Sequence, residues 1–273
     1  MRDNRTSGGL QPTRRQWLLG SAGLAGASLW SRTARADHYG PADGTRVLVI
    51  GDSMIAGGFG LYLARGLGKD HGHSVTRRGK SSSGLARPDF FDWIEEANTL
   101  VGENPFDATV VMFGGNDVQG LYMGKGAWVR WDDEGWSEEY ARRINALADL
   151  VAPNGQQLFW IGMPVMRPSK FNRRVQRVNT IFRAEMAIRP QARFVDIWDL
   201  FANAKGEYAD RIVLPPPPEE TEAAEAEAEA DSQEEADPPP KRKRKKVRVR
   251  AGDGIHLTVA GAHYLADHVE AIV

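Results

Sequence analysis

Short apolar runs alternate with segments of helical periodicity from residue 44 onward, and this alternation limits what the chain can fold into. Runs of about four to eight residues have the length of buried strands. The four clearest runs are 47–50, 108–113, 158–161 and 194–197, and a more polar run at 74–78 is expected to be an edge strand. Because strands that alternate with helices form parallel sheets covered on both faces, we predict a three-layer α/β/α sandwich around a five-stranded, mainly parallel sheet.

Two of the segments between these runs place their apolar residues on one helical face. The apolar positions are Tyr140, Ile144, Leu147 and Val151 in the first segment, and Phe171, Val175, Val178 and Phe182 in the second. A last helical run covers 262–272. With 41% hydrophobic residues among 273, the chain can bury the core of one domain of ordinary size.

Residues capable of chemistry follow the predicted strands directly. Ser53 comes just after the first strand, Gly79 after the second and Asn116 after the third. Asp253 and His256 precede the last helix. Because ligands and catalytic groups gather at the carboxyl ends of parallel strands, we expect these residues to converge on one edge of the sheet.

Serine, histidine and aspartate together are typical of nucleophilic catalysis. A serine hydroxyl becomes a nucleophile when a nearby base removes its proton, so His256 is predicted to be the base toward Ser53 and then the acid toward the leaving alcohol. Asp253 would accept the other imidazole N–H. Each motif alone also fits a helix cap or a turn, and it is their ordered occurrence that favours catalysis.

In this order the motifs resemble the four sequence blocks of the SGNH (GDSL-like) hydrolases. The blocks are Gly51-Asp52-Ser53-Met54, Gly79, Gly114-Gly115-Asn116-Asp117 and Asp253-Gly254-Ile255-His256. The resemblance covers residues 45–273 apart from one insert, and it points to a bacterial cell-envelope subfamily catalogued as a domain of unknown function. It implies a flavodoxin-like fold and ester hydrolysis through an acyl-enzyme on Ser53.

The resemblance also implies an oxyanion hole. Its donors would be the backbone N–H groups of Ser53 and Gly79 and the side-chain amide of Asn116. Gly84 competes with Gly79 for the second block.

Four further residues are predicted to contact the substrate because they follow motifs at the edge of the sheet. They are Trp128, Trp131, Gln119 and Arg87. A flat indole can stack on a sugar ring, but packing inside the protein is an equally good explanation of the two tryptophans.

No metal and no cofactor are predicted. The chain has no cysteine, His71 and His73 lack a third ligand at an obvious spacing, and neither a dinucleotide-binding nor a Walker sequence follows the first strand.

The first 36 residues are predicted to be a Tat-type signal peptide. Arg14-Arg15 opens a weakly apolar stretch, and residues 34–36 offer the small-x-small site of signal peptidase, with cleavage after Ala36. A retained amphipathic anchor is the alternative. Residues 37–44 are expected to be a linker, residues 45–273 to be the hydrolase domain without a membrane span, and the mature protein to be periplasmic or secreted.

Residues 215–246 differ in kind from the rest. Prolines, an acidic tract and the basic run 241–246 follow one another, and such blocks bury too little apolar area to order themselves. We predict a disordered charged insert. Its basic run resembles a nucleic-acid tract in composition, but no nucleic-acid partner is expected of an exported protein, and an anionic envelope polymer fits better.

The sequence thus favours a serine esterase that removes a small O-acyl group, most simply acetyl, from an envelope carbohydrate. An O-acyltransferase with the same three residues is the alternative within catalysis. A binding module without catalysis is the alternative outside it. The oligomeric state is left open.

Overall fold

The computed structural model describes Ala36 to Val273 except residues 42, 104 and 217–244. The predicted signal peptide, apart from Ala36, and most of the predicted insert lie outside these residues. Within the described part of the chain, no helix has both the length and the apolar character that crossing a membrane requires.

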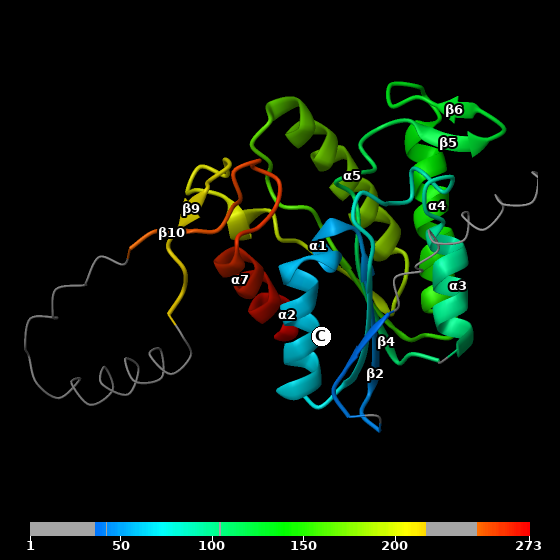
Figure 1. Cartoon of the computed structure of the whole chain (residues 1–273). Helices are drawn as coiled ribbons and strands as arrows, with labels where there is room; N and C mark the ends of the chain where they lie inside the picture. The colour runs from blue at the N-terminus through cyan, green and yellow to red at the C-terminus, as the bar shows by residue number, and fades with distance from the viewer. Residues whose placement is uncertain (1–35, 42, 104, 217–244) are drawn as a thin grey trace, which may run out of the picture. The chain divides into compact units, whose positions relative to one another are not determined.

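A six-stranded sheet with the order β1-β3-β2-β4-β7-β8 forms the centre of the fold (Figure 1). Its five parallel strands correspond to the five predicted runs. They are β2 (Arg46–Gly51), β3 (Ser74–Gly79), β4 (Ala108–Met112), β7 (Gln157–Ile161) and β8 (Ala192–Val195). Because β2 and β4 are covered on both faces, they are apolar along nearly their whole length. The predicted α/β fold with a mainly parallel sheet is confirmed.

The sixth strand corrects two expectations. β1 (Asp37–Tyr39) pairs antiparallel with β3, so these residues are not only a linker and β3 is not the edge of the sheet. The pairing gives the outer backbone groups of β3 partners, and Thr76 Oγ1 lies 3.0 Å from His38 Nδ1 across it. A strand of three residues is too short to show a periodicity.

β8 begins and ends two residues earlier than the run that predicted it. Asp196 stops the strand, because its Oδ1 accepts a hydrogen bond from Trp198 N at 3.0 Å, which forms a local turn. Ile197 still packs in the core, fully buried, just beyond the strand. The predicted strand extends too far because Ile197 is apolar although it lies in a turn.

Helices cover both faces of the sheet, with α2 and α7 on one side and α3, α4 and α5 on the other (Figure 1). The helices are α1 (Ser53–Ala56), α2 (Gly58–Lys69), α3 (Trp93–Glu103), α4 (Trp136–Val151), α5 (Ser169–Ala187) and α7 (Val259–Glu270), with a 3-10 turn η1 (Asp199–Phe201). The predicted apolar faces of α4 and α5 are buried, except that Phe171 is half-buried. α7 starts three residues before the predicted run, because Thr258 Oγ1 caps it by accepting from Gly261 N.

Two small hairpins complete the described structure. β5 (Leu121–Gly124) pairs with β6 (Ala127–Val129) in the segment that follows β4. β9 (Arg211–Ile212) pairs with β10 (Val247–Arg248). The second hairpin brings together the described residues on either side of 217–244.

Candidate active site

Ser53 is the first residue of α1, directly after β2. Asp52 caps this helix, since its Oδ1 accepts from Met54 N at 3.0 Å, and Asp52 N donates to Met112 O on β4. Gly51 is needed for the close approach of the strands, because a Cβ there would lie 2.2 Å from Met112 O. The buried strand therefore fixes the start of α1 and with it Ser53.

The structure brings Ser53 together with the two residues predicted from the other end of the chain. Ser53 Oγ lies 2.9 Å from His256 Nε2, and His256 Nδ1 lies 2.6 Å from Asp253 Oδ2. The chain between the serine and the histidine spans 203 positions. The expected convergence of these three side chains at the carboxyl end of β2 is therefore present in the fold.

The turn that carries Asp253 and His256 is organised by the aspartate itself. Asp253 Oδ1 accepts from Ile255 N at 2.8 Å and from His256 N at 3.0 Å. Partial burial of Asp253 would raise its pKa, but the hydrogen bonds from the His256 ring and from these two backbone groups outweigh it and lower the pKa to about 2. The carboxylate is therefore ionised at neutral pH and holds the imidazole through Nδ1.

Gly254 allows this tight turn. Its φ is +73°, which glycine adopts without steric cost, and an added Cβ would lie 2.5 Å from Arg167 Cβ. The backbone conformation of the turn thus explains why a glycine occupies this position of the last motif.

The predicted oxyanion donors come from three separate segments of the chain, namely the start of α1, the end of β3 and the loop after β4. Gly79 ends β3 opposite Gly51, and an added Cβ there would lie 2.3 Å from Ala56 N, so α1 crosses directly over it. Asn116 Nδ2 donates one hydrogen bond to Ser83 O at 2.9 Å. Because an amide nitrogen carries two hydrogens, the second remains for another acceptor.

Gly84, the competitor of Gly79, serves a different purpose. A Cβ at this buried position would lie 2.2 Å from Asp117 Oδ1. That oxygen accepts from Ala86 N at 2.8 Å, and Asp117 Oδ2 accepts from the Tyr140 hydroxyl at 2.7 Å. Gly84 therefore leaves room for the carboxylate that ties the loop after β3 to α4.

Sequence reasoning missed the two buried carboxylates beneath the site, Asp52 and Asp117. Burial raises the pKa of Asp52 to about 7, partly offset by its hydrogen bond from Met54 N, and burial also raises the pKa of Asp117. The available signal was that each motif has an acid beside its predicted functional residue.

The four predicted substrate contacts separate into two groups. Arg87 lies over the ring of Trp128, with its Cζ 5.1 Å from the centroid, and Trp128 is 45% exposed on β6. Trp131 is buried, with Arg174 and Arg177 each 4.9 Å from its ring. The ring of Trp131 is therefore occupied by packing, whereas Trp128 keeps an exposed surface.

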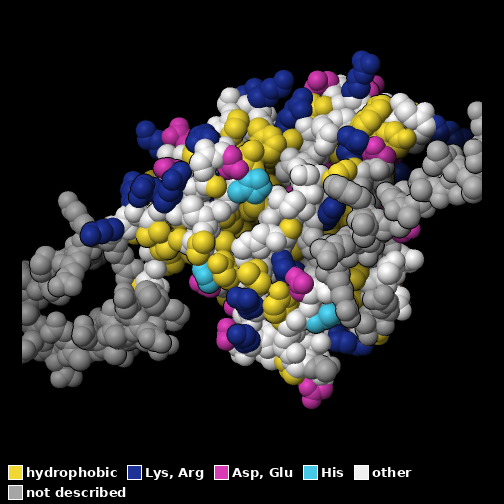
Figure 2. All heavy atoms as spheres, viewed as in Figure 1, with side chains coloured by type: hydrophobic (Ala, Val, Ile, Leu, Met, Phe, Trp, Pro, Cys, Tyr) yellow, Lys and Arg dark blue, Asp and Glu magenta, His cyan; other side chains and the backbone are white. Residues whose placement is uncertain are grey.

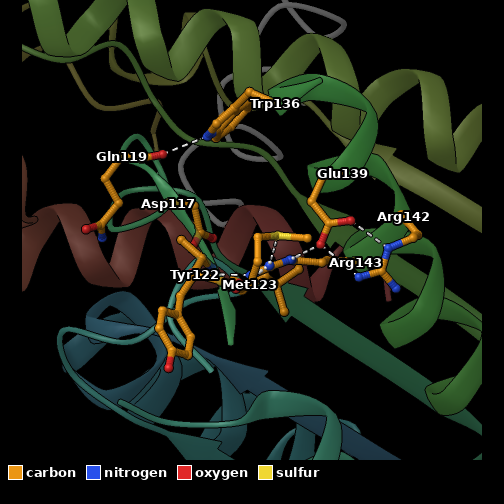
Figure 3. Close-up of polar contacts among 10 residues, drawn as sticks. Asp117, Gln119, Tyr122, Met123, Trp136, Glu139, Arg142 and Arg143 are labelled. Carbon is orange, nitrogen blue, oxygen red and sulfur yellow. Dashed lines mark hydrogen bonds and ion pairs between the residues drawn. The ribbon is translucent and has the colours of Figure 1, made fainter. Parts of the chain in front are cut away.

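The side chain and the backbone of Gln119 both form hydrogen bonds within the protein. Its Nε2 donates to Asn116 O, and its backbone carbonyl accepts from Trp136 Nε1 at 2.7 Å (Figure 3). Gln119 thus links the loop of Asn116 to the start of α4.

A small hollow adjoins the Ser53 and His256 side chains. It has a volume of about 180 Å³ and is lined mainly by apolar atoms from α1, the start of α2 and α7; its lining includes Met54, Gly57, Gly58, Phe59, Val259 and Ala262. Figure 2 shows hydrophobic side chains at the surface next to a histidine where α1 and α7 lie in Figure 1. A larger hollow of about 380 Å³ lies at the β5–β6 hairpin, with Gly120, Trp128 and Arg130 in its lining.

No group of three or more potential metal ligands occurs among the residues described by the structure. His71 and His73 stack with their ring centroids 6.2 Å apart.

Two solved structures share this fold at low sequence identity. An α/β hydrolase enzyme, LAE5, from the metagenome of Lake Arreo, Spain, has a TM-score of 0.52 and 16% identity, over 84% of this chain and 94% of that one. The native aryl esterase of M. smegmatis has a TM-score of 0.51 and 15% identity, over 84% and 97%. No curated protein matches the sequence.

Residues 46–215 match the family described as "Protein of unknown function (DUF459)". The match begins at β2 and includes Ser53, Gly79 and Asn116, whereas Asp253 and His256 follow it. It covers more than half of the chain. The protein therefore belongs to this family of unknown function, and its fold is that of the SGNH hydrolases.

Proposed function

We propose that the protein is a serine esterase of the SGNH type that forms an acyl-enzyme on Ser53. The proposal rests on one observation. Ser53 Oγ lies 2.9 Å from His256 Nε2, and His256 Nδ1 lies 2.6 Å from Asp253 Oδ2. A serine hydroxyl in contact with an imidazole that a carboxylate orients is the arrangement that activates serine in unrelated hydrolases.

The reaction follows from this geometry. With its Nδ1–H donated to Asp253, His256 presents the lone pair of Nε2 to Ser53 and accepts the hydroxyl proton as Oγ attacks the ester carbonyl. The imidazolium then protonates the leaving alcohol. A water molecule, deprotonated by the same nitrogen, hydrolyses the acyl-enzyme and returns Ser53 to its starting state.

The negative charge that develops on the carbonyl oxygen needs fixed donors. The Ser53 N–H lies in the first turn of α1, where backbone donors have no partner within the helix. Together with the Gly79 N–H and the second hydrogen of the Asn116 amide it would form the oxyanion hole. A single donor of this kind typically contributes about 3–4 kcal/mol to lowering the barrier.

The hollow beside Ser53 supports a small acyl group. Its volume is about 180 Å³, and Met54, Phe59 and Ala262 wall it. An acetyl group fits such a space, whereas a long acyl chain meets α7. We therefore infer acetyl as the preferred acyl group.

An exposed indole on the β5–β6 hairpin supports a carbohydrate as the alcohol part. Trp128 presents an exposed surface on β6, and the Arg87 guanidinium covers part of its ring. Indole faces stack well on the apolar face of a sugar. Together with the predicted export signal, this favours an envelope polysaccharide or glycan.

Chemical labelling of the serine tests the proposal directly. The purified protein is expected to react with a fluorophosphonate probe and to release nitrophenol from nitrophenyl acetate faster than from the butyrate or octanoate. Ser53→Ala should do neither. Equal labelling of wild type and Ser53→Ala, or no reaction of wild type, would favour the non-catalytic binding module instead.

Acyl transfer to a sugar is a second candidate, because the His256 side chain is 45% exposed and leaves room for a hydroxyl acceptor in place of water. Acetate release should then fall when a glycan acceptor is added, while consumption of the acetyl donor continues. Release that is unchanged by any acceptor would leave hydrolysis as the activity.

Export to the periplasm or the cell surface is the remaining part of the proposal. It rests on Arg14-Arg15 and on the small residues at 34–36. The mature form isolated from the envelope fraction is expected to begin at residue 37, and an exported protein that still begins at Met1 would indicate the retained anchor.

A further inference from the structure

A fully buried arginine lies beneath the turn that holds Asp253 and His256. Arg250 is 0% exposed and is not part of any motif discussed above. It lies opposite Leu257 in an isolated antiparallel bridge, and Ala251 N donates to His256 O at 2.8 Å. The turn 251–256 is therefore closed at its base by Arg250 and Leu257.

The guanidinium of Arg250 folds back onto the same turn. One amino group, Nη2, donates to Ile255 O at 2.9 Å and to Gly254 O at 3.2 Å. The other, Nη1, donates to Val165 O at 2.9 Å in the segment that follows β7. A single planar group thus connects the turn to the segment that follows β7.

The partners of Arg250 are unusual for a buried charge. The described residues include no salt bridge to Arg250, and its charge is met by carbonyl oxygens, by Met166 Sδ at 3.2 Å and by the rings of Phe201 and Tyr208. Burying a charge without a carboxylate partner is energetically unfavourable. Burial lowers the pKa of Arg250 to about 10, so it keeps its charge at neutral pH.

We propose that Arg250 is a positioning residue of the active site, which holds the Asp253–His256 turn in register with Ser53 and places a fixed positive charge beneath it. This inference depends on the proposed esterase activity for its catalytic consequence but not for its structural one. The side chains of His256 and Asp253 are half-exposed, so the turn has little apolar packing of its own. Arginine suits this task because its rigid fork reaches several carbonyls at once, whereas lysine offers one nitrogen.

Two substitutions separate the charge from the geometry. Arg250→Lys keeps the charge and loses the fork, whereas Arg250→Met loses both. With nitrophenyl acetate we expect kcat to fall by about tenfold to a hundredfold in both variants, because a misplaced base costs that much, while KM changes little. A similar fall in both variants would assign the effect to the fork of the guanidinium and not to its charge.

Arg143 on α4 provides a matched control. It is also buried, donates to the carbonyls of Leu85, Ala86 and Tyr122, and contacts Met123 Sδ at 3.2 Å (Figure 3). Unlike Arg250, it also forms an ion pair with a carboxylate, that of Glu139, at 2.7 Å. Arg143→Met is expected to lower the midpoint of thermal unfolding at least as much as Arg250→Met. It should leave kcat for nitrophenyl acetate near its wild-type value.

A readout without turnover distinguishes this inference from the esterase proposal. The hydrogen exchange of the Ile255 and His256 amides, which donate to Asp253 Oδ1, is measured in wild type and in the variants. Faster exchange of both amides in Arg250→Lys supports the positioning role even if no ester is hydrolysed. The inference is overturned if Arg250→Lys shows wild-type exchange of both amides and a kcat within about twofold of wild type. Arg250→Lys alone provides the test if Arg250→Met does not fold.

Discussion

The two halves of the candidate active site are held in place by different means. Ser53 follows a strand buried on both faces, and its neighbour Asp52 is 1% exposed. Asp253 and His256 lie in a turn with half-exposed side chains, organised by hydrogen bonds to Asp253 and Arg250. The position of the nucleophile is therefore a consequence of core packing, and that of the base a consequence of local polar contacts.

This difference separates stability from activity. Segments with few buried apolar contacts open at low free-energy cost, so substitutions in the turn are expected to change the reaction more than the stability of the fold. Substitutions next to Ser53 act on the core as well. Each of the following predictions tests one side of this contrast.

The largest expected effect is the loss of activity when either reacting group is removed. Ser53→Ala and His256→Ala should each lower kcat by about 10⁴-fold or more, because residues of one triad act as a unit. His256→Ala should change the free energy of unfolding by no more than about 0.5 kcal/mol, as expected of a half-exposed side chain outside the core. Urea denaturation measures this, and a strongly destabilised His256→Ala would contradict the contrast between the two halves.

The two aspartates are expected to affect stability with opposite dependence on pH. The pKa of Asp52 is raised to about 7 by burial, so the folded state binds its proton more tightly than the unfolded chain. The contribution of Asp52 to the free energy of unfolding is therefore greatest below about pH 4 and falls as the pH rises to about 7. Asp52→Asn should remove this fall and be more stable than wild type at pH 8, by up to a few kcal/mol.

Asp253 provides the matched comparison. Its pKa is lowered to about 2, so its contribution to stability is present above about pH 4 and is lost as the pH falls through about 2. Asp253→Asn should therefore lose a little stability at neutral pH and none at very low pH. The test is the free energy of unfolding of wild type and both variants, measured from pH 2 to pH 8. If the curves of Asp52→Asn and Asp253→Asn ran parallel, burial would not distinguish the serine side of the site from the histidine side.

The sequence predicted the five parallel strands and the two amphipathic helices, because buried strands and helical faces leave periodic apolar patterns. It did not predict β1, whose three residues gain their structure from the free edge of β3. It placed the end of β8 too late, because Ile197 is buried in a turn. Elements defined by long-range pairing or by a single hydrogen bond leave no pattern of their own.

The same limit applies to the site. Side chains that carry a recognisable motif, such as Ser53 and His256, could be named in advance. Arg250 could not, because its role depends on which carbonyls surround it after folding. Trp131 was an open alternative between packing and binding, and only the arginines on α5 that cover its ring show the packing.

A smaller effect is expected from filling the hollow beside Ser53. A Cβ at Gly58 would lie 3.3 Å from Ala262 Cβ and from the Tyr62 ring, so Gly58→Ala fits after a small adjustment and narrows the space. We expect the ratio of kcat/KM for nitrophenyl butyrate to that for the acetate to fall by about tenfold, in line with the effect of one or two methylenes in a pocket. A ratio that stays at the wild-type value would place the acyl group elsewhere.

The smallest effect concerns Trp128, which belongs to neither half of the triad. If its exposed indole stacks on a sugar ring, Trp128→Ala removes about 1 kcal/mol of binding free energy and raises KM for an acetylated oligosaccharide several-fold. Nitrophenyl acetate has no sugar, so its kinetics should not change, and Trp128→Phe should retain part of the effect of the ring. The comparison of the two substrates separates recognition from chemistry, because a tryptophan that only supports the β5–β6 hairpin would alter both or neither.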